Sequence, residues 1–239
     1  MAAMKQLALD IGLNTGPSLS RFYPGSNAAV LQHLQTWVGD GTPSTATSVG
    51  RAPVPTYLWG VSGAGKSHLL KGVYAALREQ GVEVGWMDAS TGFPPEFDDR
   101  WAAVIMDDVH QYTPMQQARA FNWFVNAIAP QSGTPRWVLA AGDAPPADLN
   151  LRDDLRSRLG WGHVFQLHLL DEPGRRAVLR LEADARGVFL SDDVMDYMLK
   201  RFSRDLASLM QLLDMLDGFA LRNKRAITIP LLKTMMETE

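Results

Sequence analysis

The sequence predicts an α/β domain, with a parallel sheet sandwiched by helices, followed by a small all-helical lid domain. Apolar strand-like runs alternate with amphipathic helical patterns between Thr56 and Leu169, which is typical of a doubly wound parallel sheet. After Leu170 only the helical period remains. The expected divisions are a tail over residues 1–17, an α/β domain over 18–170 and a helical lid over 171–239.

Each element has a signal of its own. Asn27 suits a helix N-cap, Thr113 precedes a proline at a first helical position, and Gly81 ends the helix that starts at Lys66. The run 101–107 is almost continuously apolar, as a strand buried on both faces requires. The expected strands are 56–59, 82–88, 101–107, 137–141 and 164–169. The expected helices are 28–38, 66–80, 114–129, 151–159, 173–186, 192–202, 206–223 and 230–237.

The composition is that of an ordinary globular protein, because the 239 residues are 46% hydrophobic and 21% charged. The lack of cysteine excludes disulfides and thiolate chemistry, and a net charge of −3 argues against a protein whose whole surface binds DNA. Without a long apolar run or a signal peptide, we expect a cytoplasmic protein with no membrane partner. Most tryptophans are expected in the core, as are the lid methionines Met195, Met198, Met210 and Met215.

Residues Gly60–Ser67 read G-x-x-x-x-G-K-S between a strand pattern and a helical pattern, which is the context that a phosphate-binding loop needs. Glycines let backbone N–H groups turn toward phosphate oxygens, and the helix N-terminus adds positive potential. Lys66 would reach the β- and γ-phosphates, and Ser67 would bind Mg²⁺. We therefore expect ADP or ATP with Mg²⁺, the alternative being a glycine-rich turn without a ligand. The expected nucleotide-binding residues here are Ser62, Gly63, Ala64, Gly65, Lys66, Ser67 and His68.

Carboxylates follow two of the expected strands. Asp107 is the expected second metal ligand beside Ser67, and Asp108 is expected to orient or deprotonate the attacking water. Asp143 would lie near the γ-phosphate, because ligands bind at the carboxyl ends of parallel strands. The alternative is ordinary aspartates at strand ends and loop starts.

A charged cluster occupies 153–162. An arginine here would stabilise charge on the phosphate of a neighbouring molecule in the transition state. The alternative is a solvated face with local Asp–Arg pairs, and spacing alone favours that alternative.

Together these stretches resemble the AAA+ ATPases, and within them the DnaA initiator group and its regulatory inactivators. The resemblance implies that Arg158 is an arginine finger and that Phe22, Tyr23 and Asn27 line the adenine side of the site. The motif matches are Gly60–Ser67 to Walker A, Val104–Asp108 to Walker B, Gly142-Asp143 to sensor 1, residues 157–162 to box VII and residues 226–230 to the end of the lid.

The tail residues 6–11 are similar to the sliding-clamp-binding peptide of these inactivators. The resemblance implies that Leu7, Leu9 and Ile11 enter an apolar groove of the DNA polymerase sliding clamp while Gln6 forms a hydrogen bond. From the alternation alone, a first β-strand is the alternative.

The resemblance implies a negative regulator of chromosomal replication initiation. Such a protein binds nucleotide, with ADP expected over ATP, reaches DNA only through the clamp, and stimulates ATP hydrolysis by DnaA through Arg158. The sequence ends after the lid, where DnaA has a further DNA-binding domain. Asp107-Asp108 replaces the usual Asp-Glu, so weak or no intrinsic ATPase activity is expected. Ala207 stands at the sensor 2 arginine position unless Arg204 substitutes, which puts lid-coupled reading of ATP against ADP in question.

Two other classes remain open at the level of sequence. A self-contained P-loop nucleotide kinase would clamp phosphate with Arg152, Arg156 and Arg158. A helicase loader of the DnaC type would bind single-stranded DNA through arginines of the first lid helix, although such arginines more often form a solvated face or pair with acidic neighbours. Those arginines are Arg175, Arg176 and Arg180. The sequence also leaves a homodimer open.

Overall fold

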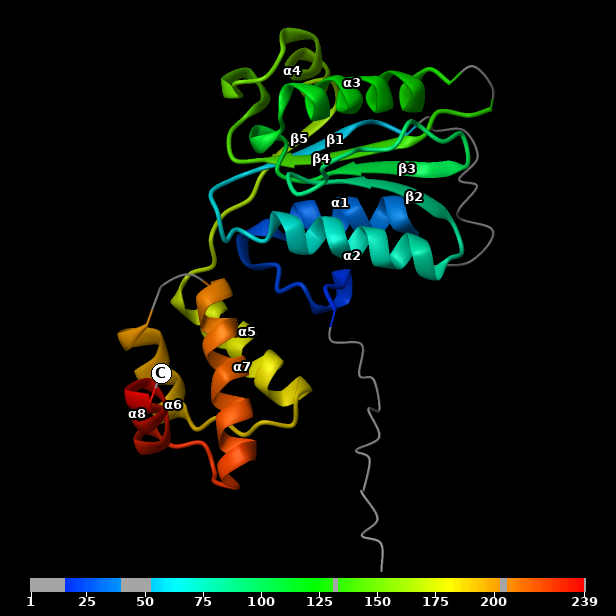
Figure 1. Cartoon of the computed structure of the whole chain (residues 1–239). Coiled ribbons are helices and arrows are strands. Elements are labelled where there is room, and N and C mark those ends of the chain that lie inside the picture. Colours follow the sequence, from blue (N-terminus) through cyan, green and yellow to red (C-terminus); the bar gives the residue numbers. More distant parts are fainter. Residues whose placement is uncertain (1–15, 40–52, 131–132, 203–205, 239) are drawn as a thin grey trace, which may run out of the picture.

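The computed structural model describes residues 16–39, 53–130, 133–202 and 206–238. These residues form a five-stranded parallel sheet with helices on both faces and a four-helix lid, so the predicted fold is confirmed (Figure 1). The strands are β1 (Thr56–Trp59), β2 (Glu83–Met87), β3 (Trp101–Met106), β4 (Trp137–Gly142) and β5 (His163–Gln166). The helices are α1 (Ala28–Val38), α2 (Lys66–Glu79), α3 (Pro114–Ile128), α4 (Asp153–Leu159), α5 (Glu172–Ala185), α6 (Asp192–Arg201), α7 (Leu206–Asn223) and α8 (Ile229–Thr238).

The strand order is β2-β3-β4-β1-β5, which places β1 between β4 and β5. The register sets Trp59 beside Gly142 of β4 and Gln166 of β5. Because every pair is parallel, the carboxyl ends of the strands gather at one edge of the sheet. The loops that follow β1, β3 and β4 therefore meet at that edge, where open α/β sheets bind their ligands.

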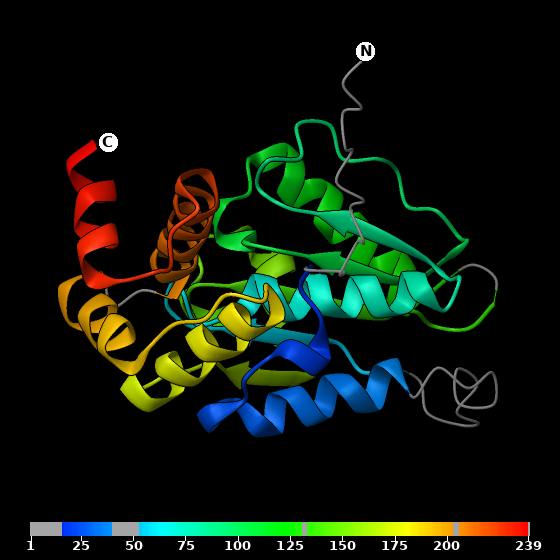
Figure 2. The same cartoon turned by 90° about the horizontal axis from the view of Figure 1, so that it is seen from below.

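Two apolar layers hold the helices to the sheet. Helices α1 and α2 lie side by side over one face, as Figures 1 and 2 show, and they cover Leu58 and Ile105. Helices α3 and α4 cover the other face, where Tyr57 and Val104 are buried. Neighbouring residues of one strand thus enter different layers, because side chains alternate along a strand. This two-sided burial explains the near-continuous apolar strands of the sequence.

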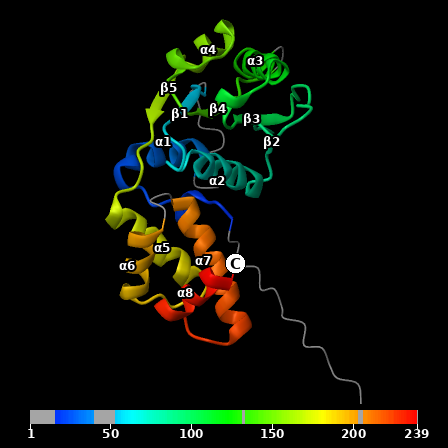
Figure 3. The same ribbon diagram turned by 60° about the vertical axis from the view of Figure 1, so that its left-hand side comes forward.

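The lid is a separate helical unit beside the α/β domain, joined to it by the segment that leaves β5 (Figure 3). Its core is centred on Leu213 and Leu216 of α7, with Met195 and Met198 buried as expected. The expectation for Met215 is wrong, because its side chain is 37% exposed. The inward stripe of α7 is formed by leucines at helical spacing, and Met215 lies between two of those positions on the outer side.

The segment after β5 corrects two expectations. The strand expected over 164–169 ends at Gln166, and the Leu167 N–H then donates to the Trp59 carbonyl (2.7 Å). Asn27 does not cap α1 with its side chain. Its amide instead donates to the His168 carbonyl (2.9 Å) and accepts from the His168 N–H (2.8 Å). Asn27 thereby fastens the start of α1 to the segment that leads to the lid.

Thr113 is the N-cap of α3, as expected, and it forms a full capping box with Gln116. The Gln116 amide also donates to three carbonyls of the loop after β2, among them that of Thr91 (2.9 Å). Gln116 therefore fixes this loop against the start of α3. None of the described helices combines the length and the apolarity needed to cross a bilayer.

Asn27→Ala is expected to lower the free energy of unfolding by about 2 kcal/mol, because it removes both hydrogen bonds between the buried Asn27 amide and the backbone of His168. Urea unfolding followed by circular dichroism measures the change. Ser26→Ala is the matched control, since Ser26 is exposed on the same segment. Equal stability of the two variants would contradict a stabilising role for the Asn27 amide.

Candidate nucleotide-binding site

The loop between β1 and α2 has the backbone of a phosphate-binding loop. Gly60, Gly63 and Gly65 all have positive φ values, of 156°, 81° and 94°. A Cβ at Gly60 would lie 2.4 Å from the Leu167 carbonyl oxygen, and one at Gly65 would lie 2.9 Å from the Phe22 ring. Glycine is therefore required at both positions, for backbone conformation and for space. The loop ends at Lys66, the first residue of α2, so its N–H groups and the helix N-terminus share one side.

The Lys66 ammonium lies over this loop. Its Nζ donates to the carbonyls of Gly60 (2.6 Å) and Val61 (3.1 Å), and its residue is only 6% exposed. Burial lowers the pKa of Lys66, while the carboxylates Asp108, Asp107 and Asp143 act in the opposite direction. A buried cation held by neutral carbonyls gains strongly when a phosphate anion arrives, because charge-assisted hydrogen bonds replace neutral ones.

Asp107 and Ser67 come together as the sequence predicts for a magnesium site. Asp107 follows β3 and is buried, the Ser67 hydroxyl is hydrogen-bonded to its carboxylate, and the Asp108 N–H donates to its Oδ1 (3.0 Å). Burial raises the pKa of Asp107, against the opposing effect of the Ser67 hydrogen bond. Within the described residues, no cluster of three or more His, Cys, Asp or Glu side chains could hold a metal. The donor set fits Mg²⁺, which commonly binds one or two carboxylates together with nucleotide phosphates and water.

Asp108 and Asp143 lie at the same edge of the sheet, after β3 and β4. Asp108 has a left-handed backbone (φ 50°), which turns the chain sharply into the next segment. The Asp143 side chain is 53% exposed, and its Oδ2 lies 3.9 Å from His110 Nε2. His110 was not expected at the site, and its Nδ1 is buried without a hydrogen-bond partner in the described part of the chain. Its only sequence signal is its place two residues after Asp108.

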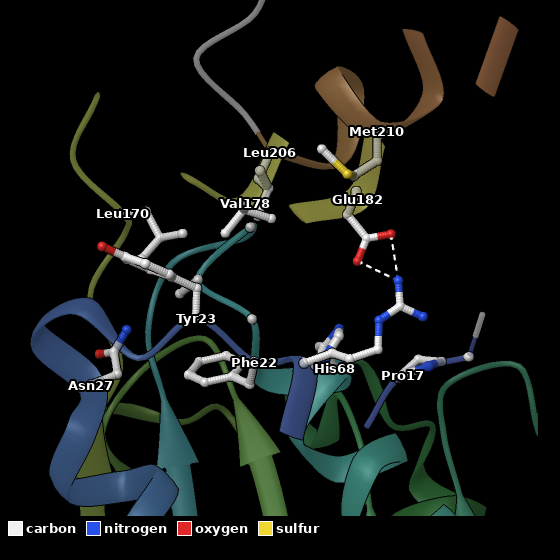
Figure 4. Close-up of a pocket in the computed structure, with 15 residues that line it drawn as sticks. Pro17, Phe22, Tyr23, Asn27, His68, Leu170, Val178, Glu182, Leu206 and Met210 are labelled. Carbon is white, nitrogen blue, oxygen red and sulfur yellow. Dashed lines mark hydrogen bonds and ion pairs between the residues drawn. The ribbon is translucent and has the colours of Figure 1, made fainter. Parts of the chain in front are cut away.

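A cavity of about 210 Å³ lies between the phosphate-binding loop, the segment before α1 and the lid (Figure 4). It contains the expected Phe22, Tyr23 and His68, together with Gly63, Ala64 and Gly65 of the loop. Asn27 also lines it, although both polar ends of its side chain are bound to His168. The lining is largely apolar and aromatic with a few polar groups, as small-molecule sites usually are.

Lid residues and one residue of the connecting segment complete this cavity, and the sequence analysis did not predict them. The lid residues are Val178, Glu182, Leu206 and Met210, and the connecting residue is Leu170. Arg21 reaches across from the segment before α1, and its Nη2 lies 2.7 Å and 2.8 Å from the two carboxylate oxygens of Glu182 (Figure 4). This ion pair closes one side of the cavity and ties the α/β domain to α5. Only the tertiary fold brings two residues so distant in sequence together.

His68 lies deep in the cavity wall. Its Nε2 is 3.2 Å from the Ser18 carbonyl, and burial lowers the pKa of the imidazole. The ring centre of Phe22 lies 5.8 Å away, so the two rings form a tilted pair beside the loop. His68 therefore joins the chain before α1 to the start of α2, in addition to lining the cavity.

Arg158 lies apart from this cavity. It belongs to α4, on the face of the sheet opposite α1 and α2 (Figure 1), and it is not among the cavity-lining residues. Its guanidinium carbon lies 5.1 Å from the ring centre of Phe121 and 4.7 Å from that of Trp161. Trp161 is 55% exposed, so the expectation of core packing is wrong for this tryptophan.

The other arginines of this cluster are paired locally. Arg152 binds Asp154 (2.7 Å) and Arg156 binds Asp153 (2.6 Å), as the local-pair alternative expected. With the described residues Arg158 forms no such ion pair. Gln6, Leu7, Leu9 and Ile11 lie outside the described residues, as does Arg204, and Ala207 is exposed on α7.

The Hda lid domain family matches residues 172–236. Among solved structures, domain III of the replication initiation protein DnaA from Thermotoga maritima is similar, with a TM-score of 0.74, 18% identity, and coverage of 98% of both chains. AMPPCP-bound DnaA from Aquifex aeolicus gives a TM-score of 0.64 at 19% identity, covering 89% of this chain and 67% of that one. The RuvB Holliday junction branch migration motor of Thermotoga maritima gives 0.65 at 16% identity, with coverage of 94% and 72%.

These similarities agree with the arrangement of the site. The sheet order, the phosphate-binding loop after β1 and the helical lid after β5 are found together in one chain. The chain therefore has the fold of DnaA domain III, and its lid, residues 172–236, is of the Hda type.

Proposed function

We propose that this protein is a negative regulator of chromosomal replication initiation, which binds nucleotide and stimulates ATP hydrolysis by DnaA. The observation that carries the proposal is Arg158, whose guanidinium contacts two aromatic rings and which does not line the cavity of its own chain. An Hda-type lid on a DnaA-like fold supports DnaA as the partner.

Nucleotide binding links the two domains in this proposal. The loop Gly60–Ser67 would hold the phosphates, Ser67 and Asp107 would hold Mg²⁺, and the cavity beside Phe22 and the lid would take the base. ADP is the expected resident nucleotide. Asp108 carries a shorter side chain than the usual glutamate and Asp143 is largely exposed, so intrinsic turnover is expected to be weak.

Arg158 acts in trans. A guanidinium offers several N–H donors in one plane, and they match the charge that spreads over the phosphoryl oxygens in the transition state. The tail residues 6–11 would hold the protein on the DNA-loaded sliding clamp, which raises the local concentration of Arg158 near DnaA. DNA is then reached through the clamp.

The contacts of the other arginines weaken the competing functions. A nucleotide kinase needs Arg152 and Arg156 free for phosphate, but each is bound to a neighbouring carboxylate. A DNA-binding face on α5 needs free arginines, but Arg180 binds Asp192 (2.6 Å) and Arg175 donates to the Leu170 carbonyl (3.0 Å).

Lys66→Ala is expected to weaken ADP and ATP binding by about 100-fold, because it removes the charged donor for the β-phosphate. Isothermal titration calorimetry with Mg²⁺ present measures the affinity. Lys200→Ala, on the exposed end of α6, is the control and should bind as the unaltered protein does. Unchanged binding by Lys66→Ala would refute the phosphate site.

Arg158→Ala is expected to lower the stimulated hydrolysis of DnaA-bound ATP by about 10³-fold, since trans arginines contribute about that much in other P-loop systems. Conversion of labelled ATP to ADP on DnaA, with clamp loaded on DNA, measures it. Arg156→Ala should leave stimulation intact, because Arg156 is paired with Asp153. Full stimulation by Arg158→Ala would rule out the finger, and equal loss in both variants would favour a phosphate-clamping surface.

Deletion of residues 1–12 is expected to abolish retention on immobilised sliding clamp, because it removes the apolar anchors of the peptide. Nucleotide affinity serves as the control and should not change, since the deleted residues precede the cavity-lining segment that begins at Gly16. Retention at the original level would place the clamp contact elsewhere on the protein.

A further inference from the structure

Arg158 is held by an aromatic cradle, formed by Phe121 of α3 and Trp161 of the turn after α4. Both ring centres lie within the roughly 6 Å over which an arginine interacts with an aromatic face. The two rings come from separate elements, so the guanidinium is contacted by parts of the chain other than its own helix. We propose that Phe121 and Trp161 are positioning residues, which orient Arg158 toward the phosphate of the partner. This inference rests on the proposed function.

Contact with an aromatic ring leaves the N–H donors and the charge of a guanidinium available, whereas an ion pair with a carboxylate does not. A carboxylate uses N–H donors of the guanidinium and neutralises its charge, as Asp154 and Asp153 do for Arg152 and Arg156. A ring interacts with the delocalised plane and leaves the in-plane N–H donors for another acceptor. Arg152 and Arg156 are thus neutralised by carboxylates, whereas Arg158 keeps its charge and its N–H donors for an anion.

The place of Trp161 is fixed by the backbone around it. The Trp161 N–H donates to the Arg158 carbonyl (3.0 Å), and the His163 N–H donates to the Pro55 carbonyl (2.9 Å). A Cβ at Gly162 would lie 2.1 Å from the Pro55 oxygen, so only glycine allows this close approach. The turn holds a large indole that is 55% exposed, so burial in the core does not explain its position. Its contact with the Arg158 guanidinium explains the position instead.

The second ring has a related role. Phe121 is half-buried, and the guanidinium carbons of both Arg158 (5.1 Å) and Arg152 (5.3 Å) lie near its ring centre. Arg152 is retained by Asp154, so it fills the space around Phe121 without competing for a phosphate. Phe121 therefore supports Arg158 from α3, while Trp161 supports it from the following turn.

Trp161→Ala tests the cradle in the DnaA-bound ATP assay with clamp loaded on DNA. The maximal rate is expected to fall about tenfold, because small displacements of a catalytic group cost rate rather than association. The concentration for half-maximal stimulation should change by less than about twofold. Trp161→Phe retains a ring and should restore most of the rate. Phe93→Ala, which removes an aromatic residue that is 91% exposed on the loop after β2, is the matched control.

A second measurement reports on the cradle without the partner. In ¹H–¹⁵N spectra, the Arg158 Nε–H resonance should shift downfield in Trp161→Ala, since the ring current of the indole is lost. Phe121→Leu should shift it in the same direction. Nucleotide affinity reports whether Trp161→Ala is folded. If that variant has lost its affinity, Phe121→Leu tests the cradle instead, by the maximal rate and by the Arg158 Nε–H resonance.

The outcomes separate this inference from the proposed function. Loss of stimulation in Arg158→Ala with full stimulation in Trp161→Ala and Phe121→Leu overturns the cradle and keeps the finger. Full stimulation in Arg158→Ala overturns the proposed function itself. A fall in affinity for DnaA with an unchanged maximal rate makes Trp161 a docking contact and also overturns the positioning role.

Discussion

The register of β1 between β4 and β5 is the constraint on which the site depends. Trp59 is paired with a strand on each side, so the position at which the chain leaves the sheet, at Gly60, is fixed. The chain must then turn directly beside the Leu167 carbonyl at Gly60 and beside the Phe22 ring at Gly65. Only glycine fits at these two positions. The sheet, the segment before α1 and the connection to the lid therefore meet at one bend of the backbone.

A buried lysine and nearby carboxylates of opposite charge lie beside that bend. Burial acts against the charged forms of both Lys66 and Asp107, and the nearby carboxylates favour the charged form of Lys66. A buried cation and a buried carboxylate at one edge are suited to an anionic ligand that arrives with a divalent cation. The same residues that are costly to bury in the α/β domain are the ones that bind Mg²⁺–nucleotide in the proposed function.

The sequence was sufficient for elements with strong local signals. The phosphate-binding loop, the strand that leads to Asp107 and the capped start of α3 were all predicted at their observed places, because each depends on neighbours in the chain. The Arg21–Glu182 pair and the lid side of the cavity were not predictable, since they require contacts over more than a hundred residues. Trp161 was misjudged because an apolar residue in a pattern does not reveal that a cation is its partner.

The connection to the lid is held at two successive residues. Leu167 lies against Gly60 of the loop after β1, and His168 is bound through both backbone groups to Asn27 beside the cavity. Any rotation of the lid must therefore take place beyond His168, within the few residues before α5 begins at Glu172. Because this pivot lies beside the phosphate-binding loop and the cavity, a small change of backbone angle there would move the far ends of α7 and α8 more than it moves the cavity wall.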